Sequence, residues 1–412
     1  MFIEKILKLN IIKFNVKIYF LFHIIFYLIR NKKIFQNKNI FLAYHWAFGH
    51  QVIMLESFIR MFDERNIEKT SLIEIVSLKH TNNYLSSIYL NYYDIFKIFQ
   101  SNQIELCNAY FSILNTIFKI IKIFNKKIRI FTYKEIINVQ ENKIKLKEKI
   151  LHYNELKNKI CERNENYYWI DKLPKFKIKY TFSNELTNIC QKVLIKNNCD
   201  IKKKTVINFF FREKKSINKK INTNLLNYFD VVRNQYNAKN YFKSIEYLAK
   251  KNKNNVIFIH GIKRENFKNI ILKNIFFVED FKNVIDFRLL NLFLHYNSYL
   301  NIMQNSGVLL LPHFMKKKII VADMFPFCFG IPGHHKVLFS RLRINNVTYK
   351  IHQITNTKYF YGEGINMKNV KIIPNSSKEI LTVIKDSNNR NSKKIKFPSN
   401  SLISYRENII YY

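Results

Sequence analysis

Runs of hydrophobic residues that end in small or polar turn residues recur along the chain and predict alternating strands and helices. The first run, Ile40–His45, predicts a buried strand, and apolar positions at helical spacing follow within Gln51–Phe62. Leu72–Val76 predicts a second strand. Asn91–Phe131 has a helical pattern that ends in strand-like residues, whereas residues 136–172 are polar and support no assignment. The first half of the chain therefore predicts an α/β domain.

The second half alternates more regularly between short apolar runs and helical patterns. Apolar runs bounded by turn residues predict strands, and apolar positions three or four apart predict helices. Strands are predicted at Thr205–Phe211, Asn255–His260, Ile275–Val278, Ile319–Ala322 and Val370–Ile373, and helices at Tyr241–Lys251, Asp286–Tyr296 and Glu379–Ile384, with Asp286 and Ser377 as N-caps. Such alternation is typical of doubly wound parallel sheets, so the predicted fold class is α/β.

Shifts in composition divide the chain into four segments. Residues 1–39 form an apolar helical segment, and residues 40–200 form an N-terminal Rossmann-like domain. The charge run Lys202–Lys204 marks a boundary near residue 200, after which residues 201–390 form a second Rossmann-like domain. Residues 391–412 are polar and are expected to be a loose tail.

The first segment contains an almost wholly apolar run, Val16–Ile29, between basic residues. A membrane-spanning helix needs about 20 apolar residues, and this run is shorter and includes Lys17 and His23. No small-residue cleavage site follows, so a signal peptide fits poorly. Two interpretations remain: a helix that lies on the inner face of the plasma membrane, with its basic flanks against anionic lipid, or a helix buried on the domain. The first interpretation predicts a cytoplasmic, peripheral protein.

The formal net charge of the 412-residue chain is +40, and 48% of its residues are hydrophobic, which is enough for a sizeable core. The charge has two explanations. One is an anionic partner such as nucleic acid or a membrane surface. The other is the composition of an A+T-rich genome, because Lys, Asn, Ile, Phe and Tyr are abundant while Gly (7) and Pro (6) are scarce. Lys is spread along the chain rather than gathered in one block, which favours the second explanation.

The cysteines and histidines support neither a disulfide framework nor a metal centre. The five cysteines are odd in number and none lies at CxxC spacing, so a reducing cytoplasm is the simpler compartment. His334 and His335 are adjacent but have no DxD-like acidic pair nearby. We therefore expect no metal ion.

A turn of small residues, formed by Asn305, Ser306 and Gly307, is the main candidate for a ligand site. It joins an apolar strand to a short helix, which Asn or Ser can cap, and Gly lets the backbone bend and approach a ligand. The N–H groups at the start of such a helix favour a phosphate. Asp323 and Phe325 follow the next strand, where ligands of parallel sheets bind. The alternative is an ordinary strand–turn–helix unit without a ligand.

Further polar residues follow other predicted strands. Gly49 is the only glycine before Gly261, which suggests that its turn needs one. His50, beside it, can act as a general base or bind phosphate, or it can simply cap the helix. Arg212 ends the strand Thr205–Phe211 and can bind a phosphate through two N–H groups, or it can form a surface ion pair.

The order and spacing of these motifs resemble the GT-B architecture of nucleotide-sugar glycosyltransferases, in which two Rossmann-like domains face a cleft. More narrowly, the chain is similar to a group of bacterial glycosyltransferases of surface-polysaccharide loci that are distantly like heptosyltransferases. The similarity covers residues 40–62 and is clearest across 205–385, where it includes Arg212-Glu213, Arg233-Asn234, the helix with Tyr241–Leu248, VIFIHG, the NSG turn, the FPF loop and IIPNSSKEI. The chain departs from the usual pattern in having Ile262 rather than an acidic residue after Gly261.

The resemblance implies transfer of a sugar from a nucleotide-diphosphate donor to a glycan or lipid-linked acceptor, in surface polysaccharide or lipopolysaccharide synthesis, without a nucleic-acid partner, a cofactor or a metal ion. Arg212 and the N–H groups of Ser306 and Gly307 would stabilise the leaving diphosphate, and His50 would take the proton of the acceptor hydroxyl. The resemblance places Gly49 on the acceptor side. On the donor side it places Arg212, Arg233, Gly261, Asn305, Ser306, Gly307, Asp323 and Phe325.

Three other functions stay open at this point. The charge of +40 is compatible with a nucleic-acid-binding protein, although no RRM, zinc-finger or helix-turn-helix pattern occurs. The scarcity of glycine is compatible with a non-catalytic scaffold that keeps the GT-B-like fold. The same architecture can also support another enzyme, such as a nucleotide-sugar epimerase, whose reaction needs no acceptor.

Overall fold

A computed structural model describes most of the chain. The described residues are 2–45, 47–62, 68–78, 81–132, 178–212, 236–267, 272–325, 336–349, 370–388, 401–404 and 409–411. They form two compact units: unit 1 contains the described residues up to Ser183, and unit 2 contains those from Asn184 onwards. The predicted fold class is confirmed, because each unit is an α/β unit built around parallel strands.

Unit 1 is built on a parallel sheet with the strand order β3-β2-β1-β4. Every residue of the central strand β1 is buried, because helices cover both faces of the sheet. The strands are β1 (Asn39–His45), β2 (Thr70–Ser77), β3 (Tyr93–Ser101) and β4 (Arg129–Phe131), and the short 3-10 helices are η1 (Lys32–Gln36) and η3 (Leu85–Tyr89).

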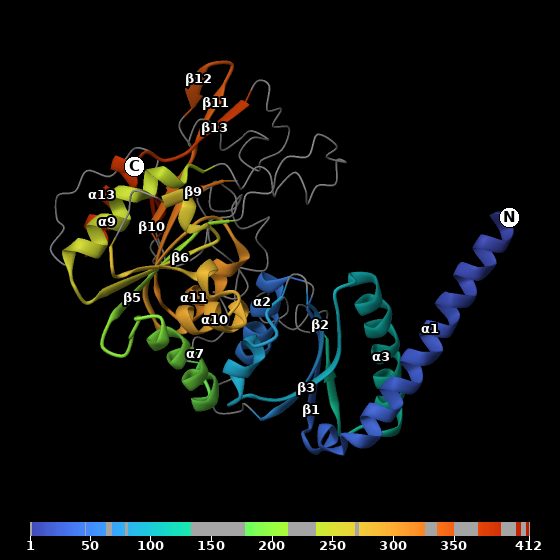
Figure 1. Cartoon of the computed structure of the whole chain (residues 1–412). Helices are drawn as coiled ribbons and strands as arrows, with labels where there is room; N and C mark the ends of the chain where they lie inside the picture. The colour runs from blue at the N-terminus through green and yellow to red at the C-terminus, as the bar shows by residue number, and fades with distance from the viewer. Residues whose placement is uncertain are drawn as a thin grey trace, which may run out of the picture. The chain divides into compact units, whose positions relative to one another are not determined.

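The helices of unit 1 are α1 (Phe2–Arg30), α2 (Phe48–Arg60) and α3 (Ile104–Phe124). The α2 helix covers one face, where Phe58 stacks on Phe41 of β1 with ring centres 4.7 Å apart. The α1 and α3 helices pack against each other on the opposite face, in one hydrophobic cluster with Leu42 of β1 (Figure 1). Adjacent residues of β1 therefore face different helices, as the two-residue period of a strand requires.

One prediction for unit 1 is wrong. The segment from Asn91 to Ser101 was expected to be helical, but Tyr93–Ser101 forms β3, which pairs with β2 along its length. The pattern in this segment is compatible with either structure, and pairing with a neighbouring strand decides the outcome. The helical part of the prediction corresponds to α3, which begins only at Ile104.

Unit 2 contains an eight-stranded sheet with the order β15-β14-β10-β9-β8-β5-β6-β7. The six strands from β10 to β7 are parallel. The chain starts in the middle at β5, moves outward through β6 and β7, then crosses to β8 and moves outward on the other side. The strands are β5 (Thr205–Phe210), β6 (Asn255–His260), β7 (Ile275–Phe277), β8 (Ser298–Met303), β9 (Lys318–Met324), β10 (Lys336–Phe339), β14 (Ser401–Ser404) and β15 (Ile409–Tyr411).

Helices cover both faces of the parallel part of this sheet. On one face, α9 (Phe242–Lys251) and α13 (Ser377–Asn388) pack side by side in a core that includes Phe209 of β5 (Figure 1). On the other face, Asn208 of β5 donates to the Leu294 carbonyl of α10, and α10 also packs against α7 and α11. The remaining helices are α7 (Asn184–Lys196), α10 (Phe287–Asn297), α11 (Leu310–Phe314), η4 (Ala238–Tyr241), η5 (Arg264–Phe267), η6 (Val278–Phe281) and η7 (Gly307–Leu309).

The last part of the chain corrects two predictions. Residues 401–404 and 409–411, expected in a loose tail, are the antiparallel strands β14 and β15, and β14 pairs with β10. The cap of the closing helix is Ser376 rather than the predicted Ser377. The Ser376 hydroxyl accepts from the Glu379 N–H, and the Glu379 carboxylate accepts from the Ser376 N–H. A separate antiparallel sheet contains β11 (Arg341–Ile344), β12 (Val347–Tyr349) and β13 (Val370–Ile373).

Candidate functional site

The candidate site lies at the carboxyl ends of β5 and β8, where the winding of unit 2 changes direction. These two strands are neighbours, and Phe210 at the end of β5 pairs with Met303 at the end of β8. The chain that leaves β5 goes to β6 on one side, whereas the chain that leaves β8 goes to β9 on the other. Ligands of doubly wound sheets bind in the crevice outside such a switch point. The residues just beyond β5 and β8 are therefore the first candidates.

Arg212 is attached to the residues that follow β8 by two hydrogen bonds. Its backbone N–H donates to Gln304 Oε1 at 3.0 Å, and its Nη1 donates to the Asn305 carbonyl at 3.1 Å. The Tyr236 hydroxyl donates to the Arg212 carbonyl at 2.5 Å. The guanidinium is half-buried and lies against the predicted turn. The structure thus brings together two parts of the predicted site that are far apart in the sequence.

The turn after β8 has the predicted cap. Ser306 has an extended backbone, and its hydroxyl accepts from the Val308 N–H at 3.4 Å. The helix that follows begins as η7 and continues as the short helix α11, so its dipole is small. The Asn305 side chain donates to the Phe325 carbonyl at 2.9 Å, which ties the turn to the end of β9. Ser306 and Gly307 are half-buried at this edge of the sheet.

Gly261 brings the end of β6 close to the chain that leaves β5. Its φ is +76°, and a Cβ atom there would lie 1.9 Å from the Phe211 carbonyl oxygen. The Phe211 N–H donates to the His260 carbonyl at 3.0 Å, directly beside this contact. Glycine is therefore required by the backbone at this position. A contact of Gly261 with a donor stays a prediction.

Asp323 and Phe325 lie inside the protein. Asp323 is 3% exposed, and its carboxylate accepts from the Tyr241 hydroxyl at 2.7 Å and from the Asn375 N–H at 2.5 Å. Its φ is +54°, in the left-handed region. Burial raises the pKa of this carboxyl to about 6, although both hydrogen bonds act in the opposite direction. Phe325 is also buried. The described contacts of Asp323 are structural, and contact of either residue with a ligand stays a prediction.

Three predicted features lie outside the described residues. These are Arg233, Glu213 and the loop from Pro326 to Phe327. Donor binding by Arg233 therefore stays a prediction.

Unit 1 has its own polar residues at the carboxyl end of β1. Gly49 and His50 lie in the first turn of α2, which begins three residues after β1. Burial, and then the nearby His45, lower the pKa of His50, so its imidazole is neutral near pH 7. A neutral imidazole has the lone pair that a general base needs.

A buried pair beside His50 was not predicted. His45 Nε2 and Glu74 Oε1 are 2.9 Å apart, and both side chains are fully buried. Burial alone would raise the pKa of Glu74, but hydrogen bonds from His45 and Ser86, together with the charge of His45, lower it. The sequence does contain a signal: Glu74 is a single acidic residue within the apolar strand β2, where a charge is costly unless it is paired.

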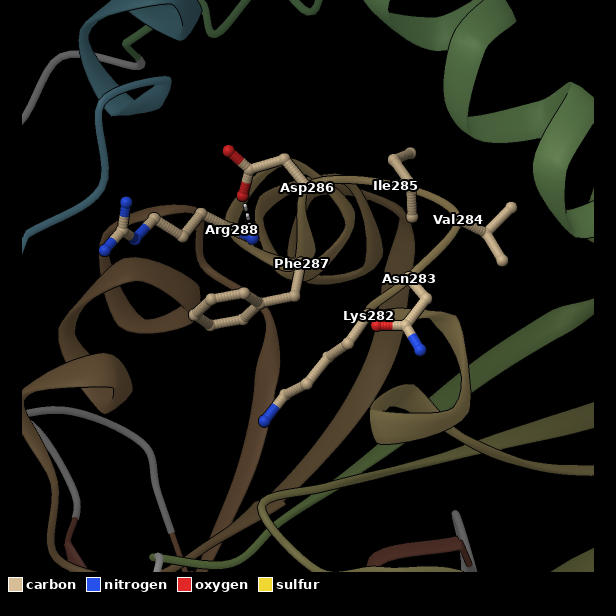
Figure 2. Close-up of a pocket in the computed structure, with 7 residues that line it drawn as sticks. All are labelled: Lys282, Asn283, Val284, Ile285, Asp286, Phe287 and Arg288. Carbon is tan, nitrogen blue, oxygen red and sulfur yellow. Dashed lines mark hydrogen bonds between the residues drawn. The ribbon is translucent and has the colours of Figure 1, made fainter.

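A surface hollow of about 540 Å³ lies at the start of α10 and contains none of the predicted site residues. Figure 2 shows Lys282, Phe287 and Arg288 around it, with both cations near the Phe287 ring. Asp286 caps the helix by accepting from the Arg288 N–H at 2.9 Å, so the helix start already has a carboxylate. Within the described ranges, no group of three His, Cys, Asp or Glu side chains is placed to hold a metal ion.

Comparisons with known proteins give structural likenesses only. No protein-family model matches the sequence, and no curated protein matches it. Among solved structures, a glycosyl transferase family 9 protein from Veillonella parvula is 12% identical, with a TM-score of 0.44, over 78% of this chain and 92% of that one.

Two further structures have weaker likeness. ADP-heptose lps heptosyltransferase II from E. coli is 8% identical, with a TM-score of 0.36, over 69% of this chain and 84% of that one. UDP-GlcNAc 2-epimerase from Neisseria meningitidis is 13% identical, with a TM-score of 0.31, over 69% and 82%. Likeness of this degree assigns no function to this chain.

Proposed function

We propose that the protein is a glycosyltransferase that moves a sugar from a nucleotide-diphosphate donor to a hydroxyl of a glycan or lipid-linked acceptor, in the synthesis of surface polysaccharide or lipopolysaccharide. One observation carries the proposal: Arg212 and the turn of Asn305, Ser306 and Gly307 meet at the switch point of a doubly wound sheet. A cation and the N–H groups of a capped turn, side by side at that place, favour a diphosphate.

The donor side of the reaction is assigned to unit 2. When the bond between the anomeric carbon and the diphosphate oxygen breaks, negative charge grows on the leaving group. The Arg212 guanidinium and the backbone N–H groups of Ser306 and Gly307 would stabilise that charge electrostatically. This arrangement supplies positive charge without a metal ion, so turnover is expected to continue in the presence of EDTA.

The acceptor side is assigned to unit 1. The acceptor oxygen attacks the anomeric carbon, and its proton goes to the neutral imidazole of His50. Because unit 1 is a second parallel α/β unit with His50 just beyond β1, it resembles the acceptor half expected of a two-domain glycosyltransferase. Burial, and after it the charge of His45, lower the pKa of this histidine.

The proposal is tested by incubating the protein with a panel of nucleotide-diphosphate sugars and a lipid or glycan extract, and by measuring release of the nucleoside diphosphate. We expect release that depends on the acceptor. Interconversion of the donor sugar without an acceptor would instead support an epimerase. No reaction with any donor would support a scaffold.

His50→Ala is expected to abolish turnover while the affinity for the donor is retained. In the wild-type protein, the rate should fall on acidification, with a midpoint below pH 6.5, because a base whose pKa is lowered loses its lone pair only in more acidic solution. Steady-state rates and calorimetric donor titrations check both statements. Wild-type turnover by His50→Ala would remove the assignment of the base.

A further inference from the structure

From Phe14 onwards, the α1 helix has large apolar side chains on its exposed side as well as on its buried side. Its buried side has Phe20, Ile24 and Leu28, one turn apart, which pack on α3 and the sheet of unit 1. The opposite side has large apolar side chains that are 62–67% exposed, namely Phe14, Phe22, Phe26 and Ile29. An apolar helix surface of this kind is normally covered by something. The exposed side extends over about 22 Å at 1.5 Å per residue.

The end of α3 also has exposed apolar side chains. Ile120, Ile123 and Phe124 in its last turns are 50–85% exposed. The two helices run alongside each other: His23 of α1 is hydrogen-bonded to Tyr110 of α3 at 2.7 Å, and Phe35, shortly after α1, stacks on Phe118 near the end of α3. The C-terminal ends of both helices are therefore at the same end of the pair, and the N-terminal half of α1 extends beyond α3 (Figure 1).

Basic residues predominate over acidic ones in and near the two helices. The α1 and α3 helices contain only two acidic residues, Glu4 and Glu105. The exposed cations at or near the two helices include Lys17, Arg30, Lys32, Lys33, Lys119, Lys122, Lys126 and Lys127. This combination of aromatic and branched apolar side chains with lysine and arginine matches an anionic lipid surface, which attracts the cations and accepts the apolar groups.

Among the described helices, α3 is the one long and apolar enough to cross a membrane. Its residues Cys107, Tyr110, Leu114 and Phe118 are nevertheless fully buried in the core of unit 1. Leaving that core would expose the parallel sheet beneath. The buried side of α1 packs on α3, so removal of α1 from unit 1 would also expose apolar residues of the core. Both helices are therefore placed to lie on a bilayer rather than to cross it.

We propose that Phe14, Ile18, Phe22, Ile25, Phe26 and Ile29 of α1, with Ile120, Ile123 and Phe124 of α3, form a membrane-docking surface for an anionic bilayer. The apolar side chains enter the boundary between headgroups and acyl chains, and the surrounding lysines and arginines contact the headgroups. Docking of this kind does not require the sugar-transfer activity proposed above. It extends the sequence-based expectation for residues 1–39 by including α3 and by naming the exposed side.

The test is co-sedimentation of the full-length protein with vesicles of phosphatidylcholine and phosphatidylglycerol, compared with vesicles of phosphatidylcholine alone. We expect binding to the anionic vesicles that weakens with added salt. The double variant Phe22→Ser, Phe26→Ser should bind at least about tenfold more weakly, since each phenylalanine removes a large apolar area from water. The matched control is Ile189→Ser, Ile195→Ser, which removes two exposed apolar residues of α7 in unit 2.

A second variant, Lys119→Glu, Lys122→Glu, alters only exposed side chains and should also weaken binding to the anionic vesicles. Unchanged circular dichroism and melting temperature show that each variant is folded. Equal binding by the α1 and α7 variants would overturn the proposal, as would absence of binding by the wild-type protein. If the wild-type protein is a dimer that Phe22→Ser, Phe26→Ser converts to a monomer, and it does not bind vesicles, a second copy covers this surface instead.

Discussion

At the scale of single residues, the edge of unit 2 depends on backbone conformations that few residues adopt. Gly261, which directly follows β6, and Asp323, near the end of β9, both have positive φ. Close contacts also fix the backbone of the residues beside them. The Phe211 carbonyl approaches Gly261, and Asn375 exchanges two hydrogen bonds with Asp323. The candidate site is thus supported by a rigid frame, which favours a fixed position for Arg212.

Gly261→Ala is expected to destabilise unit 2. A Cβ atom at this position would lie 1.9 Å from a backbone oxygen, and the left-handed conformation is unfavourable for alanine. We expect a loss of at least about 2 kcal/mol in the free energy of unfolding. Urea denaturation measures it. An unchanged midpoint would show that the close approach to Phe211 does not exist in solution.

Asp323 is expected to make stability depend on pH. Its pKa is about 6 in the folded protein and 3.8 in an ordinary environment, so the folded state binds the proton more tightly than the unfolded chain does. The contribution of Asp323 to stability therefore falls as the pH rises from about 4 to 6. Asparagine at this position does not titrate. We expect the stability of Asp323→Asn, relative to wild type, to rise by up to about 3 kcal/mol between pH 4 and 7.

The measurement is urea denaturation of both proteins at several pH values. Asp200→Asn, which replaces an exposed carboxylate of the same unit, is the control and should show little change. A stability difference between wild type and Asp323→Asn that is constant with pH, or that moves in the other direction, would contradict a buried carboxyl with a raised pKa.

At the scale of elements, the sequence predicts strands well where apolar runs are bounded by turn residues. β1, β2, β5 and β6 lie where the pattern places them, and Asp286 caps α10 as expected. β3 was not predicted, because its alternation becomes distinct from a helix only when it pairs with β2. The strands β14 and β15 were not predicted either. β14 pairs with β10, which lies far earlier in the chain, and the local sequence does not indicate that partner.

The α1 helix offers a direct test of which of its sides is buried. Ile24 is fully buried, whereas the adjacent Ile25 is 41% exposed. In the absence of lipid, Ile24→Ala should cost about 2–4 kcal/mol because it leaves a cavity against α3, and Ile25→Ala should cost less than about 1 kcal/mol. Urea denaturation of the two variants compares them. Equal effects, or a larger effect at Ile25, would contradict the described packing of α1.

The polar network around Glu56 shows what element patterns cannot predict. Glu56 lies on the buried face of α2 and accepts from the hydroxyls of Tyr89 and Tyr180 at 2.8 and 2.7 Å, while Arg60 donates to it at 3.1 Å. Tyr180 is 124 residues away in the chain. The helical pattern of α2 alone does not explain a glutamate on its apolar side, because two of the hydrogen-bond partners of that glutamate are distant in the sequence.

At the scale of the whole molecule, two α/β units with parallel strands account for the described residues. The sequence predicted this organisation, and with it the strand ends that carry Arg212, Asn305 and His50. It did not predict that Arg212 contacts the turn after β8, because that contact depends on which strands are neighbours. The buried pair of His45 and Glu74 was missed for the same reason.

The net charge of +40 also belongs to this scale. Much of it lies on exposed lysines spread over both units, and the cations near α1 and α3 are part of that wider surface. Charge alone does not select among a nucleotide, a bilayer and a nucleic acid. The residues beside the cations distinguish these ligands. Apolar side chains near the cations of α1 favour a bilayer, and the capped turn beside Arg212 in unit 2 favours a nucleotide diphosphate.

Calorimetric titration of the protein with UDP, ADP, GDP, CDP and dTDP tests the proposed diphosphate site of unit 2 most directly. We expect at least one of them to bind. Arg212→Ala should weaken that binding by about tenfold or more, through loss of a charged hydrogen-bond donor to phosphate. Arg343→Ala, which removes an exposed arginine elsewhere in unit 2, should leave it unchanged. Absence of binding by all five nucleotides, or equal affinity of wild type and Arg212→Ala, would contradict a diphosphate site at the ends of β5 and β8.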